Sequence, residues 1–320
     1  MANTRSTASI FDSLKSKLSV ITREFDNSAR ILYIDYPVHL NIGDLLINLG
    51  AEQFFKDNGL QIWRRYYVLD IPKSIPGVDD SVVFLMHGGG NFGDIYDLHQ
   101  SMREDLLARY PRNRFIFLPQ TVHFNDIEEE RRSLGRMAAH RNAKIYGRDE
   151  RSFDILKRNG IPDVGMLPDM AHQLWRVLTP LGTPESDEPF YLIRKDREAN
   201  HNHASGMVPG HAKAVDWEDI VTFGTRCVSR VARRFMRRQS RLRVPIDNSR
   251  IWYPIRDCAV RDGIRSVSKH DQVISDRLHA MLLGLLLNRR VLAMDNNYGK
   301  LSTYANTWLD EADLLQFHLG

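Results

Sequence analysis

Ile274-Ser-Asp-Arg-Leu-His-Ala280 joins a short predicted strand to an apolar predicted helix. The start of a helix collects backbone N–H donors and the positive end of the helix dipole, which together favour a bound anion. Arg277 adds a planar cation suited to phosphate or carboxylate, and His279 adds a group that titrates near neutral pH. The segment therefore predicts a site for a small dianion with proton transfer nearby. A buried salt bridge beside a core histidine would give the same residues, so both interpretations stand here.

Short apolar strands alternate with helices along the rest of the chain. The predicted strands cover residues 31–36, 62–69, 81–86, 114–118, 143–146, 190–194, 271–274 and 290–294. This alternation is typical of a parallel sheet with helices on both faces, so the sequence predicts an α/β fold. Ligands bind at the carboxyl ends of strands in such sheets. The loops at 41–44, 87–94, 119–123 and 147–149 lie at such ends.

The length of 320 residues suits two hydrophobic cores better than one. We expect a polar N-terminal segment over 1–29 and an N-terminal α/β domain over 30–178. A stretch rich in proline and acid follows over 179–189 and predicts a linker. A C-terminal α/β domain over 190–320 then carries the Ser-Asp-Arg-Leu-His motif.

Composition places the chain among water-soluble proteins. It is 42% hydrophobic and 26% charged, with a net charge of +4. The N-terminal residues lack the apolar stretch of a secretory signal, and the longest apolar run, Ala280–Leu287, is too short to span a bilayer. Cys227 and Cys258 have no CxxC partner, which suits a reducing compartment. We therefore expect a cytoplasmic protein whose membrane contact, if any, is peripheral.

A glycine-rich loop, His87-Gly-Gly-Gly-Asn-Phe-Gly-Asp94, follows the strand at 81–86. It contains the spacing of a dinucleotide-binding fingerprint, but the next strand ends in Leu118-Pro-Gln120 without the acid that would bind a ribose, which argues against nicotinamide. The chain also has no Gly-x-Ser-x-Gly elbow and no P-loop, which argues against a hydrolase or a P-loop NTPase. The loop still allows close backbone approach to an anion. Its candidate ligand-binding residues are Gly88, Gly89, Gly90 and Asn91.

Two further strand-to-helix junctions carry candidate residues. Asn41 and Asp44 could cap a helix or form a polar wall of a cleft, and the sequence does not choose between these roles. Arg148 could supply a second cation to the site, while Asp149 could be a helix cap. His201, His203 and His211 have no carboxylate or cysteine at ligand spacing and predict a solvated loop rather than a metal site.

A strongly basic helix is predicted from Asp216 to about residue 239. Between residues 226 and 243 there are eight arginines and no acid. Val228, Val231, Phe235 and Met236 give it a partial apolar face. Nucleic-acid binding is disfavoured, because no aromatic platform or recognised motif accompanies the charge. Contact with an anionic membrane surface and a solvated helix face both remain open.

Taken in order, these stretches resemble the polysaccharide pyruvyl transferase family. The resemblance rests on Asn41-Ile-Gly-Asp44 with Asn48, the loop 87–94, Gly147-Arg-Asp149 with Ser152, Ser275-Asp-Arg-Leu-His279, and Asp295-Asn-Asn-Tyr-Gly-Lys300. It covers roughly residues 30–310. The basic region at 195–250 is the part that does not align.

The resemblance implies two Rossmann-like domains in a glycosyltransferase-B-like arrangement with a cleft between them. It implies phosphoenolpyruvate as donor, without a metal or other cofactor. The acceptor would be a sugar diol of an exopolysaccharide repeat unit or cell-surface glycan, including lipid-linked oligosaccharides, and the product a pyruvate ketal. Arg277, Leu278 and His279 would contact phosphoenolpyruvate, with Arg148 as the arginine of the first domain.

The chemistry of ketal formation assigns further roles. His279 is the expected acid or phosphate-side proton donor, and Asp276, His87 or Asp94 is the expected base. Two other functions remain open at this point. One is a nucleotide-sugar-dependent glycosyltransferase of the same fold, and the other is a non-catalytic glycan- or anion-binding protein.

Overall fold

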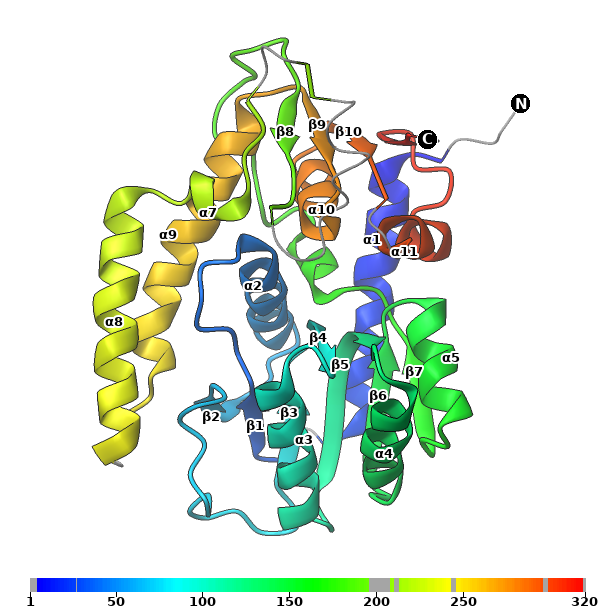
Figure 1. Ribbon diagram of the computed structural model, residues 1–320, viewed down its shortest axis with the longest axis vertical. Coiled ribbons are helices and arrows are strands. Elements are labelled where there is room, and N and C mark those ends of the chain that lie inside the picture. Colours follow the sequence, from blue (N-terminus) through cyan, green and yellow to red (C-terminus); the bar gives the residue numbers. More distant parts are fainter. Residues whose placement is uncertain are drawn as a thin grey trace.

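The computed structural model describes residues 5–26, 28–195, 208–209, 213–242, 246–295 and 299–318. Its elements form two groups, each built on a parallel sheet (Figure 1). The first group consists of α1 (Thr7–Leu18), η1 (Ser19–Glu24), β1 (Ile31–Ile34), α2 (Ile42–Asp57), β2 (Ile62–Tyr66), β3 (Val83–Met86), β4 (Gly89–Gly93), α3 (Asp97–Arg109), β5 (Arg114–His123), α4 (Ile127–Ala138), β6 (Ala143–Gly147), α5 (Glu150–Arg158), β7 (Asp163–Met166) and η2 (Met170–Leu174). The second consists of β8 (Phe190–Leu192), α7 (Trp217–Ile220), α8 (Phe223–Leu242), α9 (Ser249–Ser268), β9 (Gln272–Ser275), α10 (Leu278–Leu286), β10 (Arg290–Ala293), α11 (Lys300–Trp308) and β11 (Leu315–Phe317). The predicted α/β class is confirmed, with parallel sheets of Rossmann-like character.

The first sheet has the strand order β2-β1-β3-β5-β6-β7, with β4 added beside β5. Strands β1 and β3 are apolar and fully buried, as expected for central strands covered on both faces. The chain leaves β1 in one direction to reach β2 and returns on the other side to form β3, so the strand order reverses between β1 and β3. Ile34 pairs with Met86 there, which brings Asp35 and His87 together at the carboxyl edge. Such a reversal point is where open α/β sheets bind ligands.

The second sheet has the order β11-β10-β9-β8. Leu192 of β8 pairs with Ser275 of β9, so Arg194 and Asp276 follow neighbouring strand ends. The motif of residues 275–279 therefore occupies the carboxyl edge of this sheet, as the sequence predicts.

Helix α2 packs on elements of both groups. It packs against η2 and α10, and a single apolar core contains side chains of both sheets (Figure 1). At Gly50 the backbones come so close that an added Cβ would lie 2.1 Å from the carbonyl oxygen of Met170. Residues 179–189 of the predicted linker carry no helix or strand, but Glu185 and Ser186 donate backbone hydrogen bonds to Lys269.

The N-terminal segment contains a helix that the sequence analysis does not assign. Phe11, Leu14 and Leu18 of α1 are buried in the large core. The backbone N–H and the hydroxyl of Thr7 both donate to the carboxylate of Asp313, at 2.8 and 2.6 Å. The segment is therefore an integral part of the fold, and its attachment joins two stretches far apart in sequence.

Three predicted elements need correction. The predicted loop over 87–94 is wrong for Gly89–Gly93, which form β4 beside β5. The strand predicted to end at residue 118 continues through Pro119 to His123, because a register shift between Phe117 and Gln120 removes the need for a ladder hydrogen bond at the proline. The single helix predicted from Asp216 is two helices, α7 and α8, because Val221 adopts an extended conformation.

We expect Gly50→Ala to destabilise the protein by about 1–3 kcal/mol, because its Cβ must displace backbone of η2 rather than a flexible side chain. Gly135→Ala is the matched control. Gly135 lies in helix α4 with open space around it, so alanine there should stabilise by about 0.5–1 kcal/mol. Urea denaturation of both variants measures the difference. Equal stability of the two variants would contradict this view of the α2–η2 contact.

Candidate functional site

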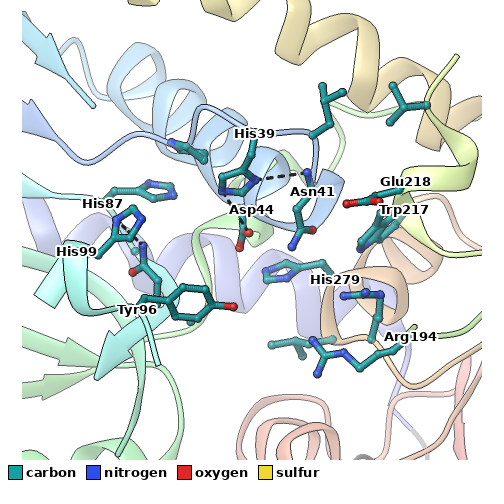
Figure 2. Close-up of a pocket in the computed structure, with 18 of the residues that line it drawn as sticks. His39, Asn41, Asp44, His87, Tyr96, His99, Arg194, Trp217, Glu218 and His279 are labelled. Carbon is teal, nitrogen blue, oxygen red and sulfur yellow. Dashed lines mark hydrogen bonds and ion pairs between the residues drawn. The ribbon is translucent and has the colours of Figure 1, made fainter. Parts of the chain in front are cut away.

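A cavity of about 560 Å³ lies where the carboxyl edges of the two sheets meet (Figure 2). Most of the site residues predicted from the sequence line it. They are Asn41, Asp44, His87, Gly88, Gly90, Asn91, Arg148, Asp276, Arg277, Leu278 and His279. The cavity is also lined by residues that the sequence analysis did not select: Asp35, Pro37, His39, Leu40, Tyr96, His99, Arg194, Trp217, Glu218, Val221, Arg226, Ser229, Arg230, Arg233 and Leu301.

His279 is held between the first turns of α10 and α2. An added Cβ on Gly43 would lie 3.0 Å from both Cβ and Nδ1 of His279, so only glycine lets the ring pack this closely. Asn41 caps α2 by accepting a hydrogen bond from the Gly43 N–H at 3.0 Å. Asn41 thus has both roles that the sequence left open, as a helix cap and as a cavity wall.

A buried carboxylate that the sequence analysis missed, Asp169, connects the two sides of the cavity. Its Oδ2 lies 3.3 Å from His279 Nε2 and 2.6 Å from an Arg148 nitrogen. Burial opposes ionisation, but His279 and Arg148 lower the pKa of Asp169 well below its usual value. Arg148 also donates to the Thr121 hydroxyl at 2.7 Å. Asp169 therefore stays ionised, orients His279 and balances the charge of an arginine that is only 1% exposed.

The motif residues of the second sheet form their own contacts. Arg277 pairs with Asp216 at 2.6 Å, which fixes the guanidinium at the cavity wall. Asp276 accepts a hydrogen bond from the Arg194 backbone N–H at 2.9 Å, and burial raises the pKa of Asp276. Asp216 thus holds the side chain of Arg277 in place beside the cavity, and Asp276 holds the backbone of Arg194.

His87 occupies the first sheet's edge as a neutral ring. Burial lowers the pKa of His87 to about 4. Its Nδ1 lies 2.6 Å from the Tyr33 hydroxyl, which itself accepts from Asn48 at 3.3 Å. The hydroxyl therefore donates to Nδ1, and the ring carries its proton on Nε2. Within the described part of the chain, this buried Nε2 has no hydrogen-bond partner.

A second histidine–carboxylate pair lies beside His87. His99 Nδ1 is 2.7 Å from the carboxylate of Asp35, which also pairs with Arg103 at 3.2 Å. Burial opposes ionisation of Asp35, but the hydrogen bond with His99 and the charges of His99 and Arg103 lower its pKa. Asp35 adopts φ of 73°, an uncommon conformation for a non-glycine residue at a strand end. Figure 2 shows His99 and His279 on opposite sides of the cavity.

Arginines supply much of the cavity wall. Six of them line it: Arg148, Arg194, Arg226, Arg230, Arg233 and Arg277. Arg226, Arg230 and Arg233 come from one side of α8, and no carboxylate of the described residues forms an ion pair with them. The α8 side of the cavity therefore has a concentration of positive charge that would favour an anionic group.

Gly89 and Asp94 do not line the cavity. The Asp94 carboxylate accepts backbone hydrogen bonds from Asn125 and Asp126, at 2.7 and 2.9 Å, and so fixes the start of α4. Gly89 adopts φ of 124° and packs against Ile47. Both residues support the glycine-rich loop from outside the cavity.

The described residues contain neither a candidate metal site nor a candidate membrane span. In this part of the chain, no group of three histidine, cysteine or acidic side chains is placed to hold a metal ion. None of its helices combines the length and apolarity needed to cross a bilayer. His201, His203 and His211 lie outside the described residues.

The buried neutral state of His87 predicts a pH-dependent stability. Its folded pKa of about 4 lies below the usual value of about 6.5, so the unfolded chain binds this proton first as pH falls. Wild-type stability should therefore fall more steeply than that of His87→Gln between about pH 7 and 4.5, with a difference of about 2 kcal/mol. Urea denaturation across this range measures both curves. Parallel curves would mean that His87 is not held neutral.

Comparison with known proteins identifies the family. A sequence profile described as polysaccharide pyruvyl transferase matches residues 41–298. A Bacillus subtilis protein named "Putative pyruvyl transferase EpsO" is 32% identical over 302 residues, covering 93% of this chain and 91% of that protein. Pyruvyl transferase 1 of Schizosaccharomyces pombe is 23% identical, over 89% of this chain and 71% of that protein.

The fold also has a solved counterpart. A crystal structure of an uncharacterized Klebsiella pneumoniae protein superposes with a TM-score of 0.63 at 18% sequence identity, covering 96% of this chain and 99% of the other. This likeness concerns the fold alone. From the family profile and the relatives together, the chain belongs to the polysaccharide pyruvyl transferase family and is a pyruvyl transferase.

Proposed function

We propose that this enzyme transfers pyruvate from phosphoenolpyruvate to a sugar diol of an exopolysaccharide repeat unit or cell-surface glycan, and that the product is a pyruvate ketal. The observation that carries this proposal is the cavity in which His279, held by the ionised Asp169, faces a wall of arginines. A trianionic donor and a proton-transfer step both require these features.

Phosphoenolpyruvate carries a phosphate and a carboxylate close together. Arg277 and Arg194, which follow neighbouring strand ends, are proposed to bind one of these groups with the N-terminal backbone of α10. Arg148 adds positive charge to the site. Because it pairs with Asp169, its main proposed role is to position His279 through that carboxylate.

The reaction begins with protonation of the methylene carbon, which makes C2 electrophilic. Asp169 engages Nε2 of His279, and we propose that the His279 imidazolium delivers this proton. One sugar hydroxyl then attacks C2 and loses its proton. The second hydroxyl attacks the same carbon, loses its proton, and phosphate departs. Two C–O bonds form and one breaks, with the arginines stabilising the leaving phosphate.

His99 is the base that the geometry favours. Asp35 accepts from Nδ1 of His99, which leaves Nε2 as the proton acceptor, in the manner of other histidine–carboxylate pairs. The candidates from the sequence fit less well. Asp276 already accepts from the Arg194 backbone, Asp94 lies off the cavity, and His87 carries its proton on Nε2 and is better suited to donate a hydrogen bond to a substrate.

The proposal includes a glycosyltransferase-B-like architecture, with the two sheets as separate Rossmann-like domains and their boundary in residues 179–189. The cavity would then be the cleft between them. We also propose that the protein acts in the cytoplasm. We further propose a peripheral contact of residues 226–243 with an anionic membrane.

The donor can be tested by ligand-induced stabilisation. At one hundred times its dissociation constant, phosphoenolpyruvate should stabilise the protein by about 2.7 kcal/mol and raise the melting temperature by roughly 3–6 °C. Nucleotide sugars should leave the melting temperature unchanged. Differential scanning fluorimetry measures both. Stabilisation by a nucleotide sugar alone would favour the glycosyltransferase, and donor binding without phosphate release on any glycan diol would favour a non-catalytic binding protein.

The proposed acid and base can be tested together. His279→Gln and His99→Gln should each lower acceptor-dependent phosphate release by about 10²- to 10⁴-fold, because each removes one proton-transfer group. His99→Gln should keep the thermal shift with phosphoenolpyruvate. His318→Gln, at an exposed histidine outside the cavity, is the control and should retain full activity. Near-normal turnover in either of the first two variants would remove that residue from the mechanism.

A further inference from the structure

Helix α8 has two surfaces with different chemistry. Ser229, Ala232, Met236 and Gln239 are buried and fix its rotation against the rest of the protein. Figure 1 shows α8 at the outer edge of the molecule, beside α9. Near its C-terminal end, the hydroxyl of Ser240 lies 3.2 Å from that of Tyr67. The helix is thus firmly held by one side, and the opposite side is left to solvent.

The outward side of α8 carries an apolar stripe. Val228, Val231 and Phe235 recur at helical spacing and are 57%, 71% and 52% exposed. Phe223, at the start of the helix, is 74% exposed. The helix is fixed by its buried side, while this stripe keeps more than half of its side-chain surface exposed. Clustered exposed apolar side chains of this kind mark a surface for interaction.

A row of arginines runs beside the stripe. Arg230, Arg234 and Arg238 are exposed and spaced four residues apart, and α8 contains no aspartate or glutamate. None of the three forms an ion pair with a carboxylate of the described residues. An apolar stripe next to unpaired cations, with low overall hydrophobicity, is the pattern of a helix that lies in a membrane interface.

We propose that α8 docks the protein on an anionic membrane surface, with Val228, Val231 and Phe235 entering the headgroup boundary and the arginine row binding lipid phosphates. Other occupants fit this surface less well. A nucleic acid would satisfy the arginines but leave the apolar stripe in water. A second copy of the chain in a two-fold contact would bring arginine rows near each other.

Docking would also orient the cavity. Arg226, Ser229, Arg230 and Arg233 of α8 line the cavity, so the helix that is proposed to dock also forms part of the cavity wall. Docking would therefore hold the cavity within about one helix diameter, roughly 10 Å, of the membrane surface, where it could receive an acceptor held at that surface. The docking itself does not depend on which reaction the cavity performs.

Co-sedimentation of the full-length protein with lipid vesicles tests the proposal. We expect binding to vesicles of phosphatidylcholine with phosphatidylglycerol, little binding to phosphatidylcholine alone, and weakening at high salt. The triple variant Val228→Ser, Val231→Ser, Phe235→Ser should bind at least about tenfold more weakly, because it removes the apolar contribution. Arg234→Gln with Arg238→Gln, which are outside the cavity wall, should remove the preference for anionic lipid.

The control is Val177→Ser with Leu181→Ser, since these side chains are 41% and 45% exposed but lie in the segment after η2. It should bind vesicles like the wild type. Unchanged thermal melting confirms that each variant folds. The proposal is overturned if the wild type does not bind anionic vesicles, if the triple variant binds as tightly as the wild type, or if the triple variant instead disperses a dimer. None of these readouts uses turnover, so failure of the proposed reaction would be seen separately.

Discussion

The site depends on one buried anion. The carboxylate of Asp169 follows the last strand of the first sheet and contacts Arg148 of that sheet together with His279 of the second. Removing one member of such a buried pair leaves an uncompensated charge, at a cost of about 3–5 kcal/mol. The same contact therefore secures the packing of the two sheet edges and fixes the histidine at the cavity. The same interaction thus stabilises the fold and positions the histidine. Because Asp169 compensates its charge, Arg148 can be almost completely shielded from water.

The sequence predicted the features that depend on local pattern. The apolar strands followed by helices predicted the parallel sheets, and strand ends predicted where the cavity residues would lie. His87, Arg148 and the motif residues 276–279 were found this way and do line the cavity. The family resemblance added their order along the chain, and the profile match confirms that membership. It did not by itself reveal how any of these side chains is held.

The missed residues are those whose role comes from distant contacts. Asp169 follows β7, a short strand whose residues are only partly buried and give no alternating or continuous apolar signal. Asp35 and His99 lie far apart in sequence and meet only because β1 and β3 are neighbours and α3 starts nearby. Helix α9 contains Pro254 and Gly263, which weaken its helical pattern, yet tertiary packing stabilises it. Asp94 shows the opposite error. Its place in the glycine-rich motif predicted a catalytic base, but its carboxylate fixes the start of α4 outside the cavity.

The attachment of Thr7 to Asp313 has a consequence for the order in which the chain is completed. The carboxylate that anchors the first turn of helix α1 is synthesised 306 residues after Thr7. During translation the apolar face of α1 therefore lacks part of its final packing surface until the segment that contains Asp313 has been made. A chain released by the ribosome before Asp313 is made would lack this anchor and leave the helix more accessible to quality-control proteases.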